Sequence, residues 1–177
     1  MTKAFATLIL SLLLCLPAKA QQELRHMFTQ ISVNDGLPQN TISSIVQDDN
    51  GMIWIATTGG LARYDSYHFD TYHPNNHKTD CLASDVISDL CRDSKGRVWI
   101  ATDKGLQVYN PKMNTFASYT KENGRLNTNK ITSLYYASGN RILAGTNSGL
   151  VIINISTGDK QVYTGNINGD KKFTNAY

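Results

Sequence analysis

The sequence predicts an all-β protein, a partial β-propeller of about three four-stranded blades that this chain does not close. Three observations support this fold. A segment of about 45 residues occurs three times after residue 36, turns containing glycine divide each copy, and short runs rich in β-branched and aromatic residues lie between the turns. Self-similarity at this period is typical of solenoids and propellers, and glycine turns this frequent favour short strands over paired helices.

The first segment has the features of an export signal. Residues 1–20 carry Lys3, then an apolar run from Ala4 to Leu16, then the small-x-small site Ala18-Lys19-Ala20 before Gln21. The run of 13 residues is shorter than the roughly 20 that a membrane span needs. We therefore expect a signal peptide over 1–20, cleavage, a periplasmic location and no membrane insertion of the mature chain. Lipidation at Cys15 is disfavoured because leucines precede it.

The remaining chain is predicted to follow the repeat. Trp54 is equivalent to Trp99 and Leu143, and the glycine that ends one turn recurs at the same offsets. The predicted parts are an outer strand and lead-in over 21–36, blade repeats over 37–81, 82–125 and 126–172, and the start of a fourth repeat over 173–177.

Within the first repeat, four strands are expected between three turns. The predicted strands are an alternating run from Ile42 to Gln47, then Met52–Thr57 around Trp54, Leu61–Tyr64 and Phe69–Tyr72. Asp48-Asp49-Asn50-Gly51 and Thr58-Gly59-Gly60 supply the first two turns, and glycine suits the left-handed backbone of such turns. A blade buries little surface alone, so Trp54, Trp99 and Leu143 are predicted as structural packing between blades.

Charge excludes two classes of partner. The formal net charge is +3, and two of the lysines lie in residues 1–20, so the remainder is close to neutral. Such a balance predicts no nucleic-acid surface and no polybasic membrane patch. Cys81 and Cys91 remain after export, where a disulfide is permitted. A disulfide between them is possible, but two separate thiols are favoured because spacing alone does not fix the geometry that a disulfide needs.

Motifs for catalysis and metal binding are weak. His73 and His77 flank a Pro-Asn-Asn loop, Ser118-Tyr-Thr-Lys121 lies at a strand end, and Asp48–Gly51 lacks the spacing and final glutamate of a calcium loop. We expect no enzyme activity, no metal and no cofactor.

A ligand surface is predicted at one end of the blades. The lead-in to each first strand and the turn between its second and third strands lie at that end. The candidate binding residues are Asn40, Asp85 and Asn129 in the lead-ins and Thr58, Asp103 and Asn147 in the turns. These types suit hydroxyl-rich ligands, and they are also ordinary turn formers.

Two stretches also carry a family resemblance. The run D-x-x-G-x-[IV]-W-I-A-T-x-x-G-L over Asp48–Leu61 and Asp93–Leu106 resembles the two-component-regulator propeller repeat. The third repeat departs, with Ala137 for aspartate and Leu143 for tryptophan. The resemblance implies that this chain is the amino-terminal part of the periplasmic sensor region of a hybrid histidine kinase, and that its ligands are glycans. A propeller scaffold for protein–protein contacts and a non-functional truncated product are the alternatives.

The two ends of the repeat array generate an expectation about partners. The sequence predicts an outer strand over His26–Ser32 and the lead-in to another first strand over Phe173–Tyr177, so both end faces are expected to lack a neighbour in this chain. Further propeller blades or self-association, for example two chains in a six-bladed ring, would cover them.

Overall fold

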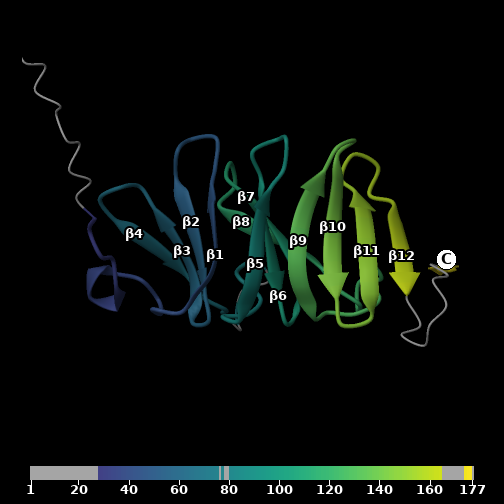
Figure 1. Cartoon of the computed structure of the whole chain (residues 1–177), viewed down its shortest axis with the longest axis horizontal. Helices are drawn as coiled ribbons and strands as arrows, with labels where there is room; N and C mark the ends of the chain where they lie inside the picture. The colour runs from purple at the N-terminus through teal and green to yellow at the C-terminus, as the bar shows by residue number, and fades with distance from the viewer. Residues whose placement is uncertain (1–27, 76, 78–79, 165–173, 177) are drawn as a thin grey trace, which may run out of the picture. The chain divides into compact units, whose positions relative to one another are not determined.

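The computed structural model describes residues 28–75, 77, 80–164 and 174–176 (Figure 1). The chain divides into two units, 1–30 and 31–177. The predicted signal peptide lies outside the described residues. Only 28–30 of the first unit are described, and they have no regular secondary structure. The second unit contains the fold and is described by itself below.

Three antiparallel sheets make up the second unit, with the strands of each sheet in chain order. The first contains β1 (Ile42–Gln47), β2 (Ile53–Thr57), β3 (Gly60–Tyr64) and β4 (Phe69–Tyr72). The second contains β5 (Ile87–Arg92), β6 (Val98–Thr102), β7 (Gly105–Asn110) and β8 (Thr115–Tyr119). The third contains β9 (Ile131–Ala137), β10 (Arg141–Thr146), β11 (Gly149–Asn154) and β12 (Lys160–Thr164), extended by β13 (Thr174–Ala176).

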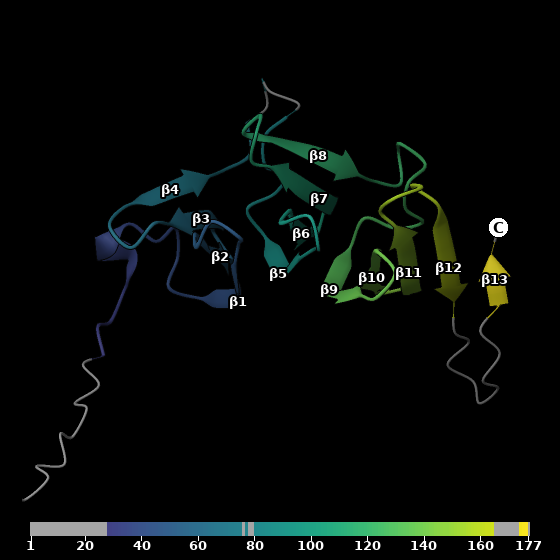
Figure 2. The same cartoon turned by 90° about the horizontal axis from the view of Figure 1, so that it is seen from above.

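The prediction of an all-β, partial propeller is confirmed. The described residues contain no α-helix, and none of their helical segments is long and apolar enough to cross a membrane. Strand β5 contacts both β1 and β9, so the first strands of the three sheets are neighbours, as Figure 2 shows. Every residue of β6 is buried, whereas β1 is mostly exposed. The second sheet is therefore covered on both faces.

The outer strand expected within 21–36 is absent from the described part of that segment. Residues 28–32 are irregular, and Val33–Asp35 form a 3-10 helix. The backbone N–H of Ser32 donates to Asp35 and the backbone N–H of Asn34 donates to the Ser32 hydroxyl. Gly36 ends the turn at φ 116°. This local capping satisfies backbone groups that a strand would have to pair with another strand.

The expected start of a fourth repeat also differs. Within 173–177, the structure places Thr174–Ala176 in β13, which pairs antiparallel with β12 through Val162↔Ala176 and Thr164↔Thr174. Without this pairing, β12 would be the outer edge of the third sheet, with unpaired backbone groups there. This segment therefore extends the third sheet at its edge.

One hydrogen-bonded unit closes the first hairpin of each of the first two sheets. Oδ1 of Asp48 accepts the backbone N–H groups of Asn50 and Met52, at 2.9 and 3.1 Å. Oδ2 of the same carboxylate accepts Nε1 of Trp54 at 2.9 Å. The buried carboxylate thus ties the turn to the packed indole. The Asp48 carboxylate therefore serves the turn and the indole, which gives this loop a structural role in place of the calcium loop that its residue types resemble.

The second repeat repeats the unit, and the third lacks both of its members. Asp93 accepts Nε1 of Trp99 at 2.8 Å and the guanidinium Nε of Arg97 at 2.7 Å. At the equivalent positions the third repeat has Ala137 and Leu143. An indole N–H buried without an acceptor costs free energy, as does a buried carboxylate without donors. The third repeat lacks both the carboxylate and the indole, so neither group is left without its hydrogen-bond partner.

The two tryptophans lie between successive sheets. Trp54 is fully buried against residues of the second sheet, including Ile87 and Tyr109, whose ring lies 4.6 Å from the indole. Trp99 is fully buried against the third sheet, including Ile131 and Ile142. Leu143 is only half-buried and belongs to neither of these two clusters. The third sheet turns this residue away from the second sheet.

A bulge in the first strand of each of the first two sheets adds a polar contact between sheets. The register shifts between Ile42 and Ser44 and again between Ile87 and Asp89. The hydroxyl of the bulged Ser43 donates to the carbonyl of Ile87 at 2.8 Å, and Ser88 donates to Ile131 at 2.7 Å. The residue left out of its own ladder thus pairs with the next sheet.

The two cysteines occupy separate environments. Sγ of Cys81 accepts the backbone N–H of Asn75, whereas Cys91 lies in β5 and packs against the core around Trp99. Burial, assisted by the carboxylates of Asp89 and Asp93, raises the pKa of the Cys91 thiol to about 12. The structure favours the alternative of two separate thiols.

Replacing Trp99 or Trp54 by alanine should lower the free energy of unfolding by about 3–5 kcal/mol, because a large cavity remains between the sheets. Asp93→Ala alone should cost about 1–3 kcal/mol, since the indole N–H loses its acceptor. The double variant Asp93→Ala/Trp99→Leu, which copies the third repeat, should cost less than the sum of its single variants. Denaturant unfolding of the unchanged protein, Asp93→Ala, Trp99→Leu and the double variant measures these costs. Strictly additive costs would contradict the coupling between the two residues.

The pKa of Cys91 predicts a pH dependence of stability. The folded chain holds this proton to a higher pH than the unfolded chain, so stability should fall from about pH 9 towards pH 12. Cys91→Val, which introduces the residue found at the equivalent Val46, should reduce that slope and leave stability below pH 8 nearly unchanged. Denaturant unfolding from pH 7 to pH 11 checks this. An identical slope in the variant contradicts the assignment.

Candidate functional site

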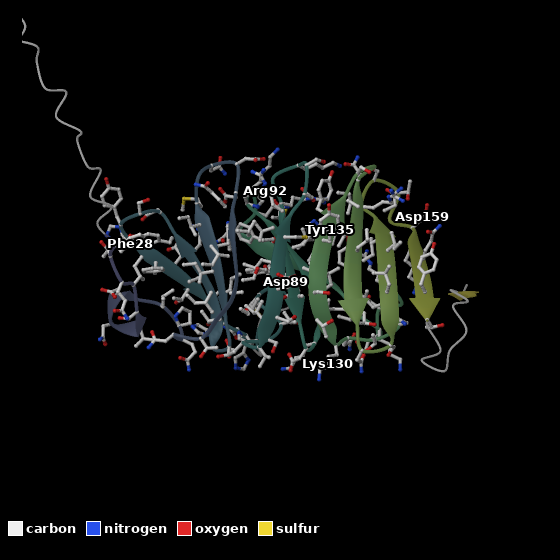
Figure 3. All side chains as sticks on the ribbon, in the orientation of Figure 1. Phe28, Asp89, Arg92, Lys130, Tyr135 and Asp159 are labelled. Carbon is white, nitrogen blue, oxygen red and sulfur yellow. The ribbon has the colours of Figure 1, made fainter. Side chains whose placement is uncertain are left out.

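The candidate residues lie at one end of the strands, the end marked by Lys130 in Figure 3. Arg92 and Asp159 mark the opposite end in the same view. Each lead-in enters its first strand at the Lys130 end, and the turn from the second to the third strand returns there. We call this end of the strands the lead-in end. The six predicted binding residues that lie there are Asn40, Asp85, Asn129, Thr58, Asp103 and Asn147.

A repeated side-chain bond holds each of these turns. The hydroxyl of Thr57 donates to the carbonyl of Gly60 at 2.7 Å, and Thr102 does the same to Gly105. Thr146 and Gly149 form the third example at 2.8 Å. In each turn, a backbone N–H donates back to the threonine hydroxyl. The backbone of the turn is thereby held in one conformation.

The glycine that ends each turn is required by geometry. Gly105 has φ 133°, and a Cβ there would lie 2.7 Å from the carbonyl oxygen of Tyr119. Because threonine and glycine maintain the turn, the position after the threonine can vary. That position holds Thr58, Asp103 and Asn147, all exposed.

The three turn residues differ in their contacts. Among the described residues, the side chains of Thr58 and Asp103 have no hydrogen bond or ion pair. Oδ1 of Asn147 accepts the hydroxyl of Thr128 at 3.3 Å. Thr58 and Asp103 are therefore the two candidates whose polar atoms are directed to solvent.

The lead-in residues serve as clips within the chain. Oδ1 of Asn40 accepts the backbone N–H of Val33 at 3.0 Å, and Oδ1 of Asn129 accepts that of Lys121 at 2.7 Å. Asp85 lies 2.8 Å from Nδ1 of His73. In every repeat, this position joins the lead-in to the segment that precedes it. The turn-former alternative therefore describes these three residues well.

Two further contacts shape the lead-in end. The backbone N–H of Gly60 donates to the carbonyl of Asp85 at 3.0 Å, which joins the first sheet's turn to the second sheet's lead-in. The amide of Asn129 donates to both carboxylate oxygens of Glu122 at 2.9 Å, and these bonds lower the pKa of Glu122. The surface thus presents an ionised carboxylate beside amides and hydroxyls.

Sequence reasoning missed one buried polar anchor and one pocket. Gln107 is 1% exposed, accepts the backbone N–H of Ala83 and donates to the carbonyl of Cys81. A polar residue inside an otherwise apolar third strand was the available signal. A pocket of about 240 Å³ lies beside this lead-in, with Tyr72, His73, Asp80, Leu82 and Phe116 among its lining residues.

No group of three or more metal-ligating side chains is brought together within the described ranges. His73 is engaged by Asp85, and the backbone N–H of His77 donates to the side chain of Asn75. The two histidines of the Pro-Asn-Asn loop therefore have separate local partners.

Comparison with known proteins identifies the repeats. The family model of the two component regulator propeller matches residues 36–59 and 81–104. Each match covers a lead-in, a first strand, the Asp–Trp hairpin and a second strand. No curated protein matches the chain.

Solved structures share the arrangement of the sheets. The extracellular domain of the hybrid two component system BT3049 from B. thetaiotaomicron is 27% identical with a TM-score of 0.71, over 77% of this chain and 20% of that one. That of hybrid system BT4673 from the same organism is 27% identical with a TM-score of 0.65, over 83% and 20%. PorZ, a surface component of the type-IX secretion system of Porphyromonas gingivalis, shares the fold at 23% identity and a TM-score of 0.54, over 67% and 18%.

The chain spans about a fifth of the length of these solved structures. Its similarity to the two sensor domains extends over most of the three sheets. The sheets are therefore propeller blades similar to those of the extracellular regions of hybrid two-component systems. Two segments of the chain, residues 36–59 and 81–104, thus match the two component regulator propeller repeat.

Proposed function

We propose that this chain is part of an exported, ligand-sensing propeller of a hybrid two-component sensor. The observation that carries the proposal is its 27% identity to the extracellular domains of two such systems, together with two family repeats in register with the sheets. Its own role is to bind and to transmit. Phosphoryl transfer is assigned to other parts of such a sensor, because the motifs of this chain support no catalytic group.

We propose a neutral carbohydrate as the ligand and the lead-in end as its binding surface. Hydroxyl, amide and carboxylate groups lie there on turns held rigid by the Thr–Gly bonds. Rigid turns lower the conformational cost of binding. Asp103 and Thr58 are the favoured contacts, because their polar atoms have no partner among the described residues. Asn40, Asp85 and Asn129 hold the lead-ins to the preceding segments through their contacts with Val33, His73 and Lys121.

Titration of the chain with a panel of soluble neutral oligosaccharides, followed by calorimetry, tests the proposal. A sugar that binds should lose about tenfold in affinity in Asp103→Ala, which corresponds to about 1.4 kcal/mol. Asp159→Ala is the matched control, since this carboxylate lies at the opposite end of the strands (Figure 3) and should leave the affinity unchanged. Equal loss in both variants, or no binding by any sugar, would count against this surface.

Export makes a separate prediction. The secreted protein should begin at Gln21, because signal peptidase recognises the small residues Ala18 and Ala20. Amino-terminal sequencing of the periplasmic fraction checks the cleavage. Ala20→Arg should block processing and retain the precursor. A periplasmic protein that still begins at Met1 contradicts the prediction.

A further inference from the structure

One apolar side chain is exposed in the middle of the polar lead-in end. Val86 is 50% exposed and directly precedes β5 of the second sheet. The second sheet packs against a neighbouring sheet on each face, so this exposure does not arise at an end of the array. The equivalent residues of the other two sheets are Thr41 and Lys130, both polar. Val86 therefore gives the second sheet a surface chemistry that the other two lack at this position.

The strand register sets Val86 beside Asp103. Ile87 pairs with Thr102 in the ladder between β5 and β6, so the next residues outward, Val86 and Asp103, adjoin at the end of the two strands. The backbone N–H of Val86 donates to the hydroxyl of Ser84 at 3.1 Å, which holds this lead-in in place. The Asp103 carboxylate has no hydrogen bond or ion pair among the described residues. An apolar group and an available carboxylate thus lie next to each other.

The turn of the first sheet reaches the same place. The backbone N–H of Gly60 donates to the carbonyl of Asp85 at 3.0 Å, and Asp85 precedes Val86 in the chain. Thr58 lies two residues before Gly60 in that turn, and its hydroxyl has no partner within the described ranges. His73 fixes the junction, because its Nδ1 lies 2.8 Å from Asp85 and its ring lies against Gly60. We call four residues from these two sheets the seam: Thr58, Asp85, Val86 and Asp103.

The lead-in end of the third sheet has fewer available groups. Oδ1 of Asn147 already accepts the hydroxyl of Thr128, and the amide of Asn129 donates to the carboxylate of Glu122. The residue before β9 is the cationic Lys130, which Figure 3 labels at this end. Polar atoms that are already paired must give up those bonds before a ligand can use them. The seam is therefore favoured over the third sheet as a contact surface.

The chemistry of the seam limits what it can bind. An acidic ligand is disfavoured, because Asp85 and Asp103 both bring carboxylates to this surface. A wholly apolar ligand is disfavoured as well, since it would desolvate the polar atoms of Thr58 and Asp103 without pairing them. A neutral ring that has hydroxyl groups at its rim and C–H groups on its faces meets both requirements.

We propose that the seam binds one pyranose unit of the carbohydrate ligand, with a C–H face of the ring on Val86. The Asp103 carboxylate accepts hydrogen bonds from hydroxyl groups at the rim, and these are strengthened by its charge. The Thr58 hydroxyl bonds to the same rim from the first sheet, and Val86 contributes the burial of apolar surface. The assignment rests on the proposed function, and it adds the recognised unit and the residue that selects it, Val86.

Calorimetry with maltohexaose, cellohexaose and mannohexaose tests the seam. For a probe that binds, Val86→Thr should weaken affinity about threefold, because it keeps the branched shape and replaces a methyl group by a hydroxyl, as in the equivalent Thr41. Thr58→Val should weaken affinity by about threefold to tenfold through loss of a hydrogen bond. Lys130→Thr and Asn147→Ala are the matched controls at the equivalent positions of the third sheet, and they should stay within about twofold. All four side chains are exposed, so thermal melts should show each variant folded.

Nuclear magnetic resonance gives a readout of contact that does not depend on affinity. The methyl signals of carbon-13-labelled valine that are absent from Val86→Thr belong to Val86, and they should shift when the bound probe is added. A probe that binds without shifting these signals, or that loses affinity in the third-sheet variants and keeps it in Val86→Thr or Thr58→Val, overturns the seam and leaves the proposed function standing. Binding by none of the three probes overturns the seam, and the proposed function falls only if the rest of the sugar panel also fails to bind.

Discussion

Each sheet of this protein depends on a neighbouring sheet to cover its apolar face. Four short strands cannot bury an indole between themselves, and Trp54 and Trp99 are fully buried only because the next sheet lies over them. The second sheet, with neighbours on both faces, has a second strand that is buried throughout. Stability in such an array is approximately a sum of sheet and interface contributions. The interface is therefore the element that organises the rest of the fold.

The recurring aspartate connects this packing to the local turn. Its carboxylate holds the hairpin through backbone N–H groups and accepts the indole N–H with its other oxygen. The tryptophan can then be buried without an unsatisfied donor. The third repeat shows the reverse solution, in which Leu143 needs no acceptor and Ala137 needs no donors. Motif and variant obey the same requirement, that buried polar groups are paired.

The candidate site lies on turns at the ends of the strands, outside the packed interfaces between the sheets. Threonine and glycine hold each turn of the lead-in end, so the turn itself does not require a particular residue at the exposed position after the threonine. Thr58, Asp103 and Asn147 accordingly differ in chemistry while their turns have the same hydrogen bonds. Substitution at these positions can therefore change the chemistry of the exposed turns while the strands and interfaces stay the same.

The sequence alone determined the period, the turns, the strands and the inward-facing tryptophans, because these follow from local backbone preference and from alternation along a strand. It did not determine what each polar group pairs with. Asn40, Asp85 and Asn129 were equally suited to a ligand surface and to turns, and only their approach to Val33, His73 and Lys121 showed them to be clips. Residues 28–32 and Thr174–Ala176 differed from expectation for the same reason. A strand forms where an edge is available to pair, and the position of that edge is a property of the tertiary structure.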